Sequence, residues 1–258
     1  MNFFRILFYK WIFAIGDFCV KLVLFRKTCV SVRSGPFAGM RWGTRAVGSM
    51  VAPKLIGTYE KELASIVEHL PGFDLVIDIG AAEGWYAVGL LYRKTARKVV
   101  AFEQTENGQN GCRDNAKRNG VAELLEVRGK CEVEDLRLLL DPAPRADFRV
   151  LIVSDCEGYE NELLVAGVLQ RCRRAHLLIE THDSPVPGTH ARLAKELGSS
   201  HIVTEIQPAR RSRSDIPFSP ANPAPWWLRI SIIRRFSLSE RRGWGNAWIY
   251  AVPKSEIQ

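Results

Sequence analysis

Glycine and acidic residues come together in the run 76–86, where an apolar stretch ends at Asp78 and is followed by Gly80, Glu83 and Gly84. Glycine has no Cβ, so these two glycines let the backbone approach a ligand closely. The spacing Gly-x-x-x-Gly matches neither the Gly-x-Gly-x-x-Gly dinucleotide fingerprint nor the Gly-x-x-x-x-Gly-Lys phosphate loop. An acidic residue at the end of the run suits a ligand with a cationic amino-acid portion better than a ligand that carries phosphates.

A second apolar run ends about 20 residues later at Glu103, the spacing at which a carboxylate accepts both ribose hydroxyls of an adenosine. Together the two elements predict a nucleoside-containing ligand. The plainer alternatives are that Glu103 is a solvated strand end and that Gly80 and Gly84 are ordinary turn glycines.

A third group of polar residues follows two later apolar runs. Asp155 and Glu157 follow the first run, and Glu180, His182 and Asp183 follow the second. Imidazole titrates near neutral pH, so His182 is the candidate general base. The same side chains also suit a divalent ion that binds a diol and lowers its pKa. We favour a site without metal, because these carboxylates also suit helix capping; His182 as a satisfied polar residue at a strand end is a further alternative.

The elements that must position these residues alternate between short β-branched runs and helical patterns, which is typical of an α/β domain with a mainly parallel sheet. Residues 208–245 break the alternation with Arg210, Arg211, Arg213, five prolines and the pair Trp226 and Trp227, and indicate a long insertion. The predicted strands are Leu75–Ile79, Val99–Glu103, Leu124–Arg128, Arg149–Asp155, His176–Thr181, His201–Gln207 and Asn246–Val252.

Over residues 54–252 the sequence resembles the class I S-adenosylmethionine-dependent methyltransferases, and more closely the FkbM-like family. The resemblance rests on Gly57-Thr-Tyr-Glu60, Asp78-Ile-Gly-Ala-Ala-Glu-Gly84, Phe102-Glu103, Ser154-Asp-Cys-Glu-Gly-Tyr-Glu160 and Glu180-Thr-His182. It implies a Rossmann-like, seven-stranded, mainly parallel sheet with an antiparallel last strand. It also implies methyl transfer to a hydroxyl of a glycan or another small polar molecule.

The same resemblance places residues around the cofactor. Asp78, Gly80, Glu83 and Gly84 line the methionine half, Glu103 the ribose, and 130–132 the adenine edge. Two positions depart from the family pattern: Cys156 stands where the family usually has a small aliphatic residue, and Ala82 stands where Asn is common. The full expected cofactor set is Tyr59, Glu60, Asp78, Gly80, Ala81, Glu83, Gly84, Glu103, Gln104, Lys130, Cys131 and Glu132, and the expected catalytic set is Asp155, Glu157, Glu180 and His182.

Charge is unevenly distributed along the 258 residues. The chain carries +8 in total, but residues 51–207 are net acidic and both flanks are basic. Basic flanks suggest an anionic neighbour such as a membrane surface, an acidic glycan or nucleic acid. The six cysteines show no Cys-x-x-Cys spacing, which indicates reduced thiols in a reducing compartment.

Residues 1–30 are expected to form an apolar amphipathic helix. Three charged residues, Lys10, Asp17 and Lys21, interrupt the apolar run. These charges argue against a simple transmembrane span, and Lys10 argues against a cleaved signal peptide. The helix would lie on a lipid surface or pack against the domain or a second copy of the chain. We expect a lead-in segment at 31–60 and a methyltransferase domain at 61–258, in a cytoplasmic protein that contacts the inner face of a membrane if the helix binds lipid.

Two other functions compete with methylation of a small acceptor. A nucleic-acid methyltransferase would explain the basic flanks, but the acidic acceptor region repels phosphates, and the Pro-Pro-aromatic and Pro-Cys elements of the DNA enzymes are absent. A catalytically silent module would use residues 1–30 to bind a membrane or a partner. The insertion would form a lid over a sugar, or its aromatic side chains would pack it onto the sheet; the residues concerned are Trp226, Trp227, Arg229, Arg241, Arg242 and Trp244.

Overall fold

The computed structural model describes residues 29–43, 47, 49–141, 147–183, 186–209, 211–215, 240 and 246–256. The expected N-terminal helix and the tryptophans of the insertion lie outside these ranges. The chain divides into two compact units, one formed by 1–65 with 209–241 and the other by 66–208 with 242–258.

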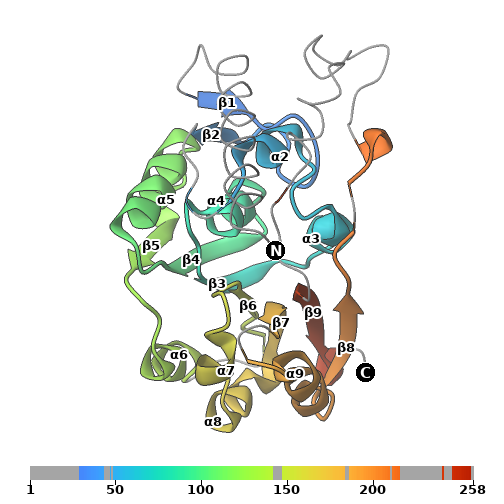
Figure 1. Ribbon diagram of the computed structural model, residues 1–258. Coiled ribbons are helices and arrows are strands. Elements are labelled where there is room, and N and C mark those ends of the chain that lie inside the picture. The colour runs from blue at the N-terminus through green and yellow to red at the C-terminus, as the bar shows by residue number, and fades with distance from the viewer. Residues whose placement is uncertain are drawn as a thin grey trace, which may run out of the picture. The chain divides into compact units, whose positions relative to one another are not determined.

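The second unit contains a seven-stranded sheet with the order β5-β4-β3-β6-β7-β9-β8 (Figure 1). Strands β3 to β7 run parallel, and β9 is antiparallel to both of its neighbours. The α/β fold with an antiparallel last strand is therefore as predicted. The strands are β3 (Phe73–Ile79), β4 (Ala96–Phe102), β5 (Leu125–Arg128), β6 (Val150–Ser154), β7 (Ala175–His182), β8 (His201–Ile206) and β9 (Asn246–Pro253), each within three residues of its predicted bounds at either end.

Helices connect the strands and cover the sheet. In Figure 1, α4 and α5 lie on one side of the sheet and α6 to α9 on the other. The helices of this unit are α4 (Trp85–Tyr92), α5 (Glu106–Arg118), α6 (Val133–Leu140), α7 (Glu160–Leu163), α8 (Ala166–Leu169) and α9 (Thr189–Leu197), with short 3-10 turns at η2 (Ala122–Leu124), η3 (Arg171–Arg174) and η6 (Lys254–Glu256).

The central strand β3 is buried on both faces, which explains its unbroken apolar sequence. Successive side chains of a strand point to opposite faces. Leu75, Ile77 and Ile79 therefore share one face, where they belong to a core cluster with residues of α6, α7, α8 and α9. The opposite face carries Val76 and Asp78. This alternation directs the carboxylate of Asp78 to the α4 side of the sheet.

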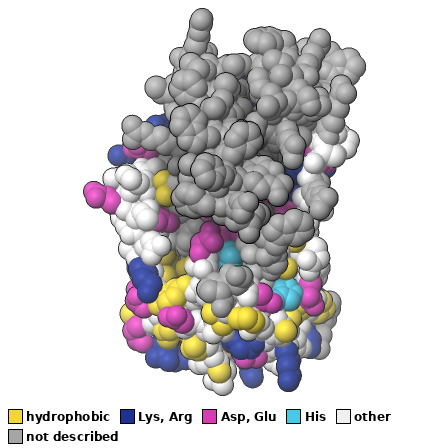
Figure 2. All heavy atoms as spheres, in the orientation of Figure 1, with side chains coloured by type: hydrophobic (Ala, Val, Ile, Leu, Met, Phe, Trp, Pro, Cys, Tyr) yellow, Lys and Arg dark blue, Asp and Glu magenta, His cyan; other side chains and the backbone are white. Residues whose placement is uncertain are grey.

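The face in Figure 2 has mixed charge over the region of α6, α8 and α9. Dark-blue lysine and arginine side chains are interspersed there with magenta acidic ones. Exposed ion pairs occur on and next to α6, where Arg137 pairs with Glu134 and Asp141 pairs with Arg171. The surface of this part of the unit is therefore electrostatically balanced rather than uniformly basic.

The first unit contains the antiparallel pair β1 (Cys29–Ser31) and β2 (Arg41–Gly43), helix α2 (Val51–Ile56) and the 3-10 turns η1 (Lys61–Leu63) and η4 (Arg213–Asp215). Helix α3 (Ala64–Glu68) follows η1 and crosses the boundary between the units. An ion cluster joins distant parts of this unit: Nη2 of Arg211 lies 2.7 Å from Oε2 of Glu62 and 2.7 Å from Oε1 of Glu240. All three side chains are nearly completely buried. Arg211 therefore connects the two ends of the predicted insertion to the segment that precedes α3.

The four described cysteine side chains, at 112, 131, 156 and 172, are free thiols. Burial raises the pKa of Cys131 and of Cys172 to about 12 each. Among the described residues, no helix combines the length and the apolar character needed to cross a bilayer.

Candidate functional site at the carboxyl ends of the central strands

The loop that follows β3 lies where the strand order reverses. The chain runs outward from β3 to β4 and β5, and then returns to β6 on the other side of β3. In open α/β sheets, ligands bind at such a switch point, outside the carboxyl ends of the strands. The loop Gly80–Gly84, Glu103 and the segment Asp155–Glu160 all follow strands at this edge, and Asp78 lies just before the end of β3.

Gly80 allows the loops after β3 and β6 to touch. Its φ is +81°, and a Cβ built there would lie 1.9 Å from the carbonyl oxygen of Asp155. A side chain at this position is excluded by both the backbone conformation and the contact. Ala82, in the same loop, also has a positive φ, of 46°. The backbone N–H groups of Gly80 and Ala81 donate hydrogen bonds to the carbonyl of Phe102 and so hold the loop against β4.

Asp78 holds the start of helix α4. Its Oδ2 accepts a hydrogen bond of 2.8 Å from the backbone N–H of Ala87, in the first turn of that helix. Asp78 and Glu83 are both buried. Their expected position next to the methionine half of the cofactor stays a prediction, and the structure adds a capping role for Asp78.

Glu103 is fixed between two loops. Its Oε2 accepts a hydrogen bond of 2.9 Å from the N–H of Ala82, and its Oε1 accepts from the N–H and Oγ1 of Thr105 at 2.7 and 2.6 Å. The side chain is 7% exposed. The β3–α4 loop and the tip of β4 are thus joined through one carboxylate. Gln104, the next residue, is exposed.

Two glycines of α5 make room for the acidic residues of this site. A Cβ on Gly108 would lie 2.6 Å from Cγ of Glu103, and a Cβ on Gly111 would lie 3.1 Å from Cβ of Glu83. Sequence analysis did not identify either glycine. Their spacing of three residues, which places them on one helix face, was the available indication.

The segment expected at the adenine edge is completed by a tyrosine that sequence analysis did not assign. Nζ of Lys130 lies 3.9 Å from the ring centroid of Tyr159, and the Tyr159 hydroxyl donates a 3.0 Å hydrogen bond to Oε2 of Glu132. Cys131, which lies between Lys130 and Glu132 in the sequence, is buried in the hydrophobic core, and its expected place at the adenine edge stays a prediction. Tyr159 therefore links this segment to the loop after β6.

His182 and three carboxylates form the second part of the site. Nε2 of His182 lies 3.7 Å from Oδ1 of Asp155 and 3.6 Å from Oε2 of Glu157. Nδ1 lies 3.1 Å from Oε1 of Glu160, whose side chain has no exposed surface. Glu160 ends the run Ser154-Asp-Cys-Glu-Gly-Tyr-Glu160, and the sequence predicted no role for it. The structure makes it the residue that orients the imidazole.

Two other acidic residues near the end of β7 differ in their positions. Glu180 is buried and accepts a 3.3 Å hydrogen bond from Nδ2 of Asn246 on β9. The Oδ1 of Asp183 instead accepts a hydrogen bond from the N–H of His190, in the first turn of α9. Asp183 therefore has a capping contact, while Glu180 contributes its charge to the surroundings of His182.

The carboxylates change the proton affinity of His182. Burial alone lowers the pKa of this imidazole, but the hydrogen bond and charge of Glu160, together with the charges of Asp155 and Glu180, outweigh burial and raise the pKa to about 9. The raised pKa favours the protonated form of the imidazole. The expected role of His182 as a general base stays a prediction.

Tyr59 and Glu60 belong to the first unit. Nζ of Lys54 lies 4.7 Å from the ring centroid of Tyr59, and the N–H of Glu60 donates a 2.9 Å hydrogen bond to Oε1 of Glu240. Their expected contact with the cofactor stays a prediction.

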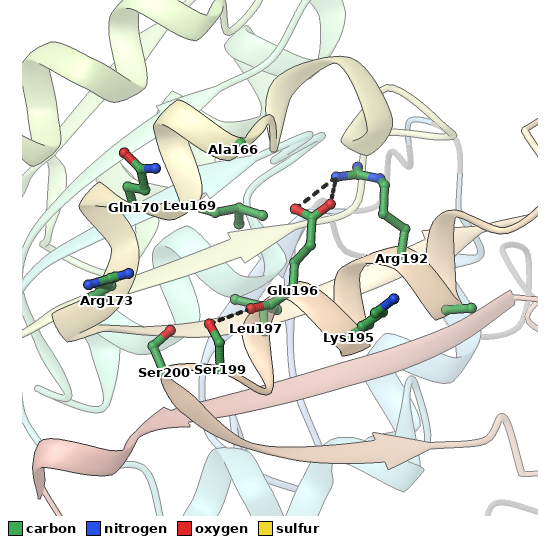
Figure 3. A pocket seen from close by; sticks show the side chains of 11 residues that line it. Ala166, Leu169, Gln170, Arg173, Arg192, Lys195, Glu196, Leu197, Ser199 and Ser200 are labelled. Carbon is green, nitrogen blue, oxygen red and sulfur yellow. Dashed lines mark hydrogen bonds and ion pairs between the residues drawn. The ribbon is translucent and has the colours of Figure 1, made fainter.

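An open hollow of about 740 Å³ lies away from these strand ends (Figure 3). Arg173 lies in η3, just before β7 begins, and Ser199 and Ser200 directly precede β8. Arg192 points across the hollow's rim to Glu196, with Nη1 3.4 Å from both carboxylate oxygens. The hollow is therefore at the amino ends of the strands and is separate from the candidate site.

Comparison with known proteins gives likenesses of fold only. No protein-family model and no curated protein matches the sequence. An O-methyltransferase from Bacillus cereus, solved in complex with SAH, is 15% identical over 76% of this chain and 81% of its own, with a TM-score of 0.49. The O-methyltransferase TomG from Streptomyces achromogenes, solved with SAM, is 13% identical over 94% of this chain and 89% of its own, with a TM-score of 0.48. A tRNA methyltransferase from Bacillus subtilis is 13% identical over 76% of this chain and 68% of its own, with a TM-score of 0.43.

Proposed function

We propose that this protein is an S-adenosylmethionine-dependent O-methyltransferase of the FkbM-like type, which methylates a hydroxyl of a glycan or another polar small molecule. One observation carries the proposal: the 2.9 Å hydrogen bond from Ala82 to Glu103. It joins the glycine-containing loop after β3 to the acidic tip of β4, at the switch point of the sheet. These are the two elements from which an adenosine-containing ligand is held in this class of fold.

The charges of the loop fit this cofactor. Asp78, Glu83 and Glu103 are all buried around the β3–α4 loop. A ligand with an ammonium group and a sulfonium offsets their negative charge, whereas the phosphates of a dinucleotide would add to it. Glu103 would hold the ribose, Asp78 and Glu83 would face the amino-acid half, and Lys130, Glu132 and Tyr159 would border the adenine. When bound, the cofactor supplies an electrophilic methyl group.

The acceptor would bind at the cluster of Asp155, Glu157, Glu160 and His182. Methyl transfer is an in-line displacement, so the protein must orient one hydroxyl oxygen and take up its proton. Glu160 fixes the imidazole of His182, and the exposed Glu157 leaves the cluster accessible from solvent. The cluster as a unit would accept the proton.

The proposed acceptor class follows from the charge of this cluster. Carboxylates bind polyhydroxylated molecules through several hydrogen bonds and repel phosphates, so a glycan fits the cluster better than a nucleic acid does. Contact of residues 1–30 with the inner face of a membrane would bring the site near glycolipids, and is part of the proposal. The protein would then act in the cytoplasm or at that membrane face.

Binding of the cofactor is the first test. Isothermal titration calorimetry with S-adenosylmethionine should give one site per chain, and Glu103→Gln should weaken binding at least tenfold because an acceptor oxygen is replaced by a donor. Glu106→Gln, an exposed change at the start of α5, is the control and should bind as the wild type does. Absence of binding to the wild type would favour the catalytically silent module.

The acceptor is tested with a methyl-labelled cofactor and a panel of oligosaccharides, glycolipids and transfer RNA. Label in the sugar fractions supports the proposal. Label in the RNA alone would replace it with the nucleic-acid alternative. Mass spectrometry of glycans from cells with and without the protein, searched for a single added methyl group, identifies the natural product.

A further inference from the structure

The sequence favours a site without metal, but from the spacing of the side chains we infer that Asp155, Glu157 and His182 form a binding site for one divalent cation. The site lies at the carboxyl ends of β6 and β7, within the second unit. The inference deepens the proposed function, because it adds an ion to the acceptor side of the same site and rests on that function for its role in methylation. Binding of the ion itself depends only on these residues.

The distances fit ligands that surround an ion. One ligand atom from each of the three residues lies within 4.8 Å of the others. Nε2 of His182 is 3.7 and 3.6 Å from the two carboxylate oxygens, beyond the range of a hydrogen bond. Metal–ligand bonds of about 2.1 Å place neighbouring ligand atoms about 3.0 Å apart in an octahedron and about 3.4 Å apart in a tetrahedron. The two distances from Nε2 would have to shorten by about 0.2 to 0.7 Å to reach these spacings.

The histidine is oriented for ligation, and an ion bound at Nε2 would displace any proton held there to solvent. Its side chain is 5% exposed, and within the described part of the chain Nε2 makes no hydrogen bond. Nδ1 is occupied by Oε1 of Glu160, and that oxygen also accepts a 3.0 Å hydrogen bond from the N–H of Cys156. A histidine ligand commonly donates its other ring N–H to a carboxylate, which fixes its tautomer and increases its basicity. The Glu160–His182 pair has this arrangement and directs Nε2 toward Asp155 and Glu157.

The remaining ligand positions would face outward. Glu157 is 86% exposed, so an ion between it and the buried His182 would keep water-accessible positions and an entry path. One imidazole nitrogen and two carboxylate oxygens suit a borderline to hard divalent ion, for which Mn²⁺ is a spectroscopically useful probe. When bound, such an ion lowers the pKa of a coordinated hydroxyl.

Electron paramagnetic resonance of the full-length protein, stripped with chelator and titrated with Mn²⁺, tests the site. The free Mn²⁺ signal should fall by one equivalent per chain. Glu157→Gln and Asp155→Asn should each weaken binding by at least tenfold. Glu134→Gln, an exposed glutamate on α6, is the matched control and should bind as the wild type does. Because Glu157 is exposed, its variant should keep the fold, which circular dichroism checks.

The inference is overturned if the wild type binds no Mn²⁺ at millimolar concentration, or if both variants bind as tightly as the wild type. Calorimetry with S-adenosylmethionine on the same stripped protein separates this inference from the proposed function. Mn²⁺ binding without cofactor binding leaves the ion site standing and removes the methyltransferase. If the stripped protein still binds the cofactor and methylates its acceptor but binds no Mn²⁺, the methyltransferase function stands and the ion site is removed.

Discussion

Nδ1 of His182 lies 3.1 Å from Oε1 of Glu160, and this contact joins the last residue of β7 to the first residue of α7. The two residues are 22 positions apart in the sequence and both are buried. The carboxylate orients the ring and raises its pKa, so Glu160, on a helix, influences the protonation of a residue on a strand. We regard Glu160 as a positioning residue of the acceptor site.

The first prediction concerns stability against pH in the presence of chelator. The pKa of His182 is raised from 6.5 to about 9 in the folded state, so its stabilising contribution is fully present below pH 6.5 and is lost as the pH rises to 9. The loss amounts to up to about 3 kcal/mol. His182→Gln should remove this dependence in urea unfolding between pH 6.5 and 9.5. The exposed His69→Gln is the control, and an unchanged slope in the His182 variant would contradict the assigned pKa.

The second prediction concerns the contact between the loops after β3 and β6. Gly80→Ala should destabilise the protein by more than about 3 kcal/mol, because the added Cβ meets a carbonyl oxygen in addition to the cost of a positive φ. Gly188→Ala has a similar φ of +88° with open space around it, and should cost only about 1 kcal/mol. Chemical denaturation gives the free energy of unfolding of both variants. Equal decreases in the two variants would show that the contact at Gly80 does not affect stability.

The third prediction separates cofactor binding from stability. Gly108→Ala adds a Cβ 2.6 Å from Cγ of Glu103, so Glu103 must move away from Thr105 or Ala82. Affinity for S-adenosylmethionine should fall at least tenfold, while the gain in helix propensity of about 1 kcal/mol offsets part of the strain. Gly167→Ala on α8, whose nearest neighbour would lie at 3.7 Å, should leave the affinity unchanged. Wild-type affinity in Gly108→Ala would argue against a role of Glu103 in binding.

The fourth prediction concerns the buried ion cluster of the first unit. Arg211→Met leaves Glu62 and Glu240 without the guanidinium that lies between them, and should destabilise the protein by about 3 to 5 kcal/mol. Arg97→Met removes an ion pair with Asp74 whose arginine is 84% exposed, and should cost less than about 1 kcal/mol. Thermal unfolding of both variants makes the comparison. Similar melting temperatures would mean that the cluster does not stabilise the fold.

The sequence by itself determined the sheet and the strand tips of the candidate site. Apolar runs separated by turn residues are local patterns that can be read from the sequence. A parallel strand such as β3 is buried on both faces, so nearly all of its residues must be apolar. For the same reason, the positions of Asp78, Glu103, Asp155 and His182 at strand ends followed directly from where the runs stop.

Only the tertiary structure decided which of these side chains meet. The Gly80–Asp155 contact, the seating of Glu103 against α5 and the pairing of His182 with Glu160 all join segments from different strands or helices. Asp183 and Asp155 lie equally close to strand ends in the sequence, yet Asp183 caps α9 while Asp155 faces the imidazole. Which side chains meet at this edge of the sheet depends on how segments that are distant in the sequence pack together. A local pattern of apolar and polar residues does not specify that packing.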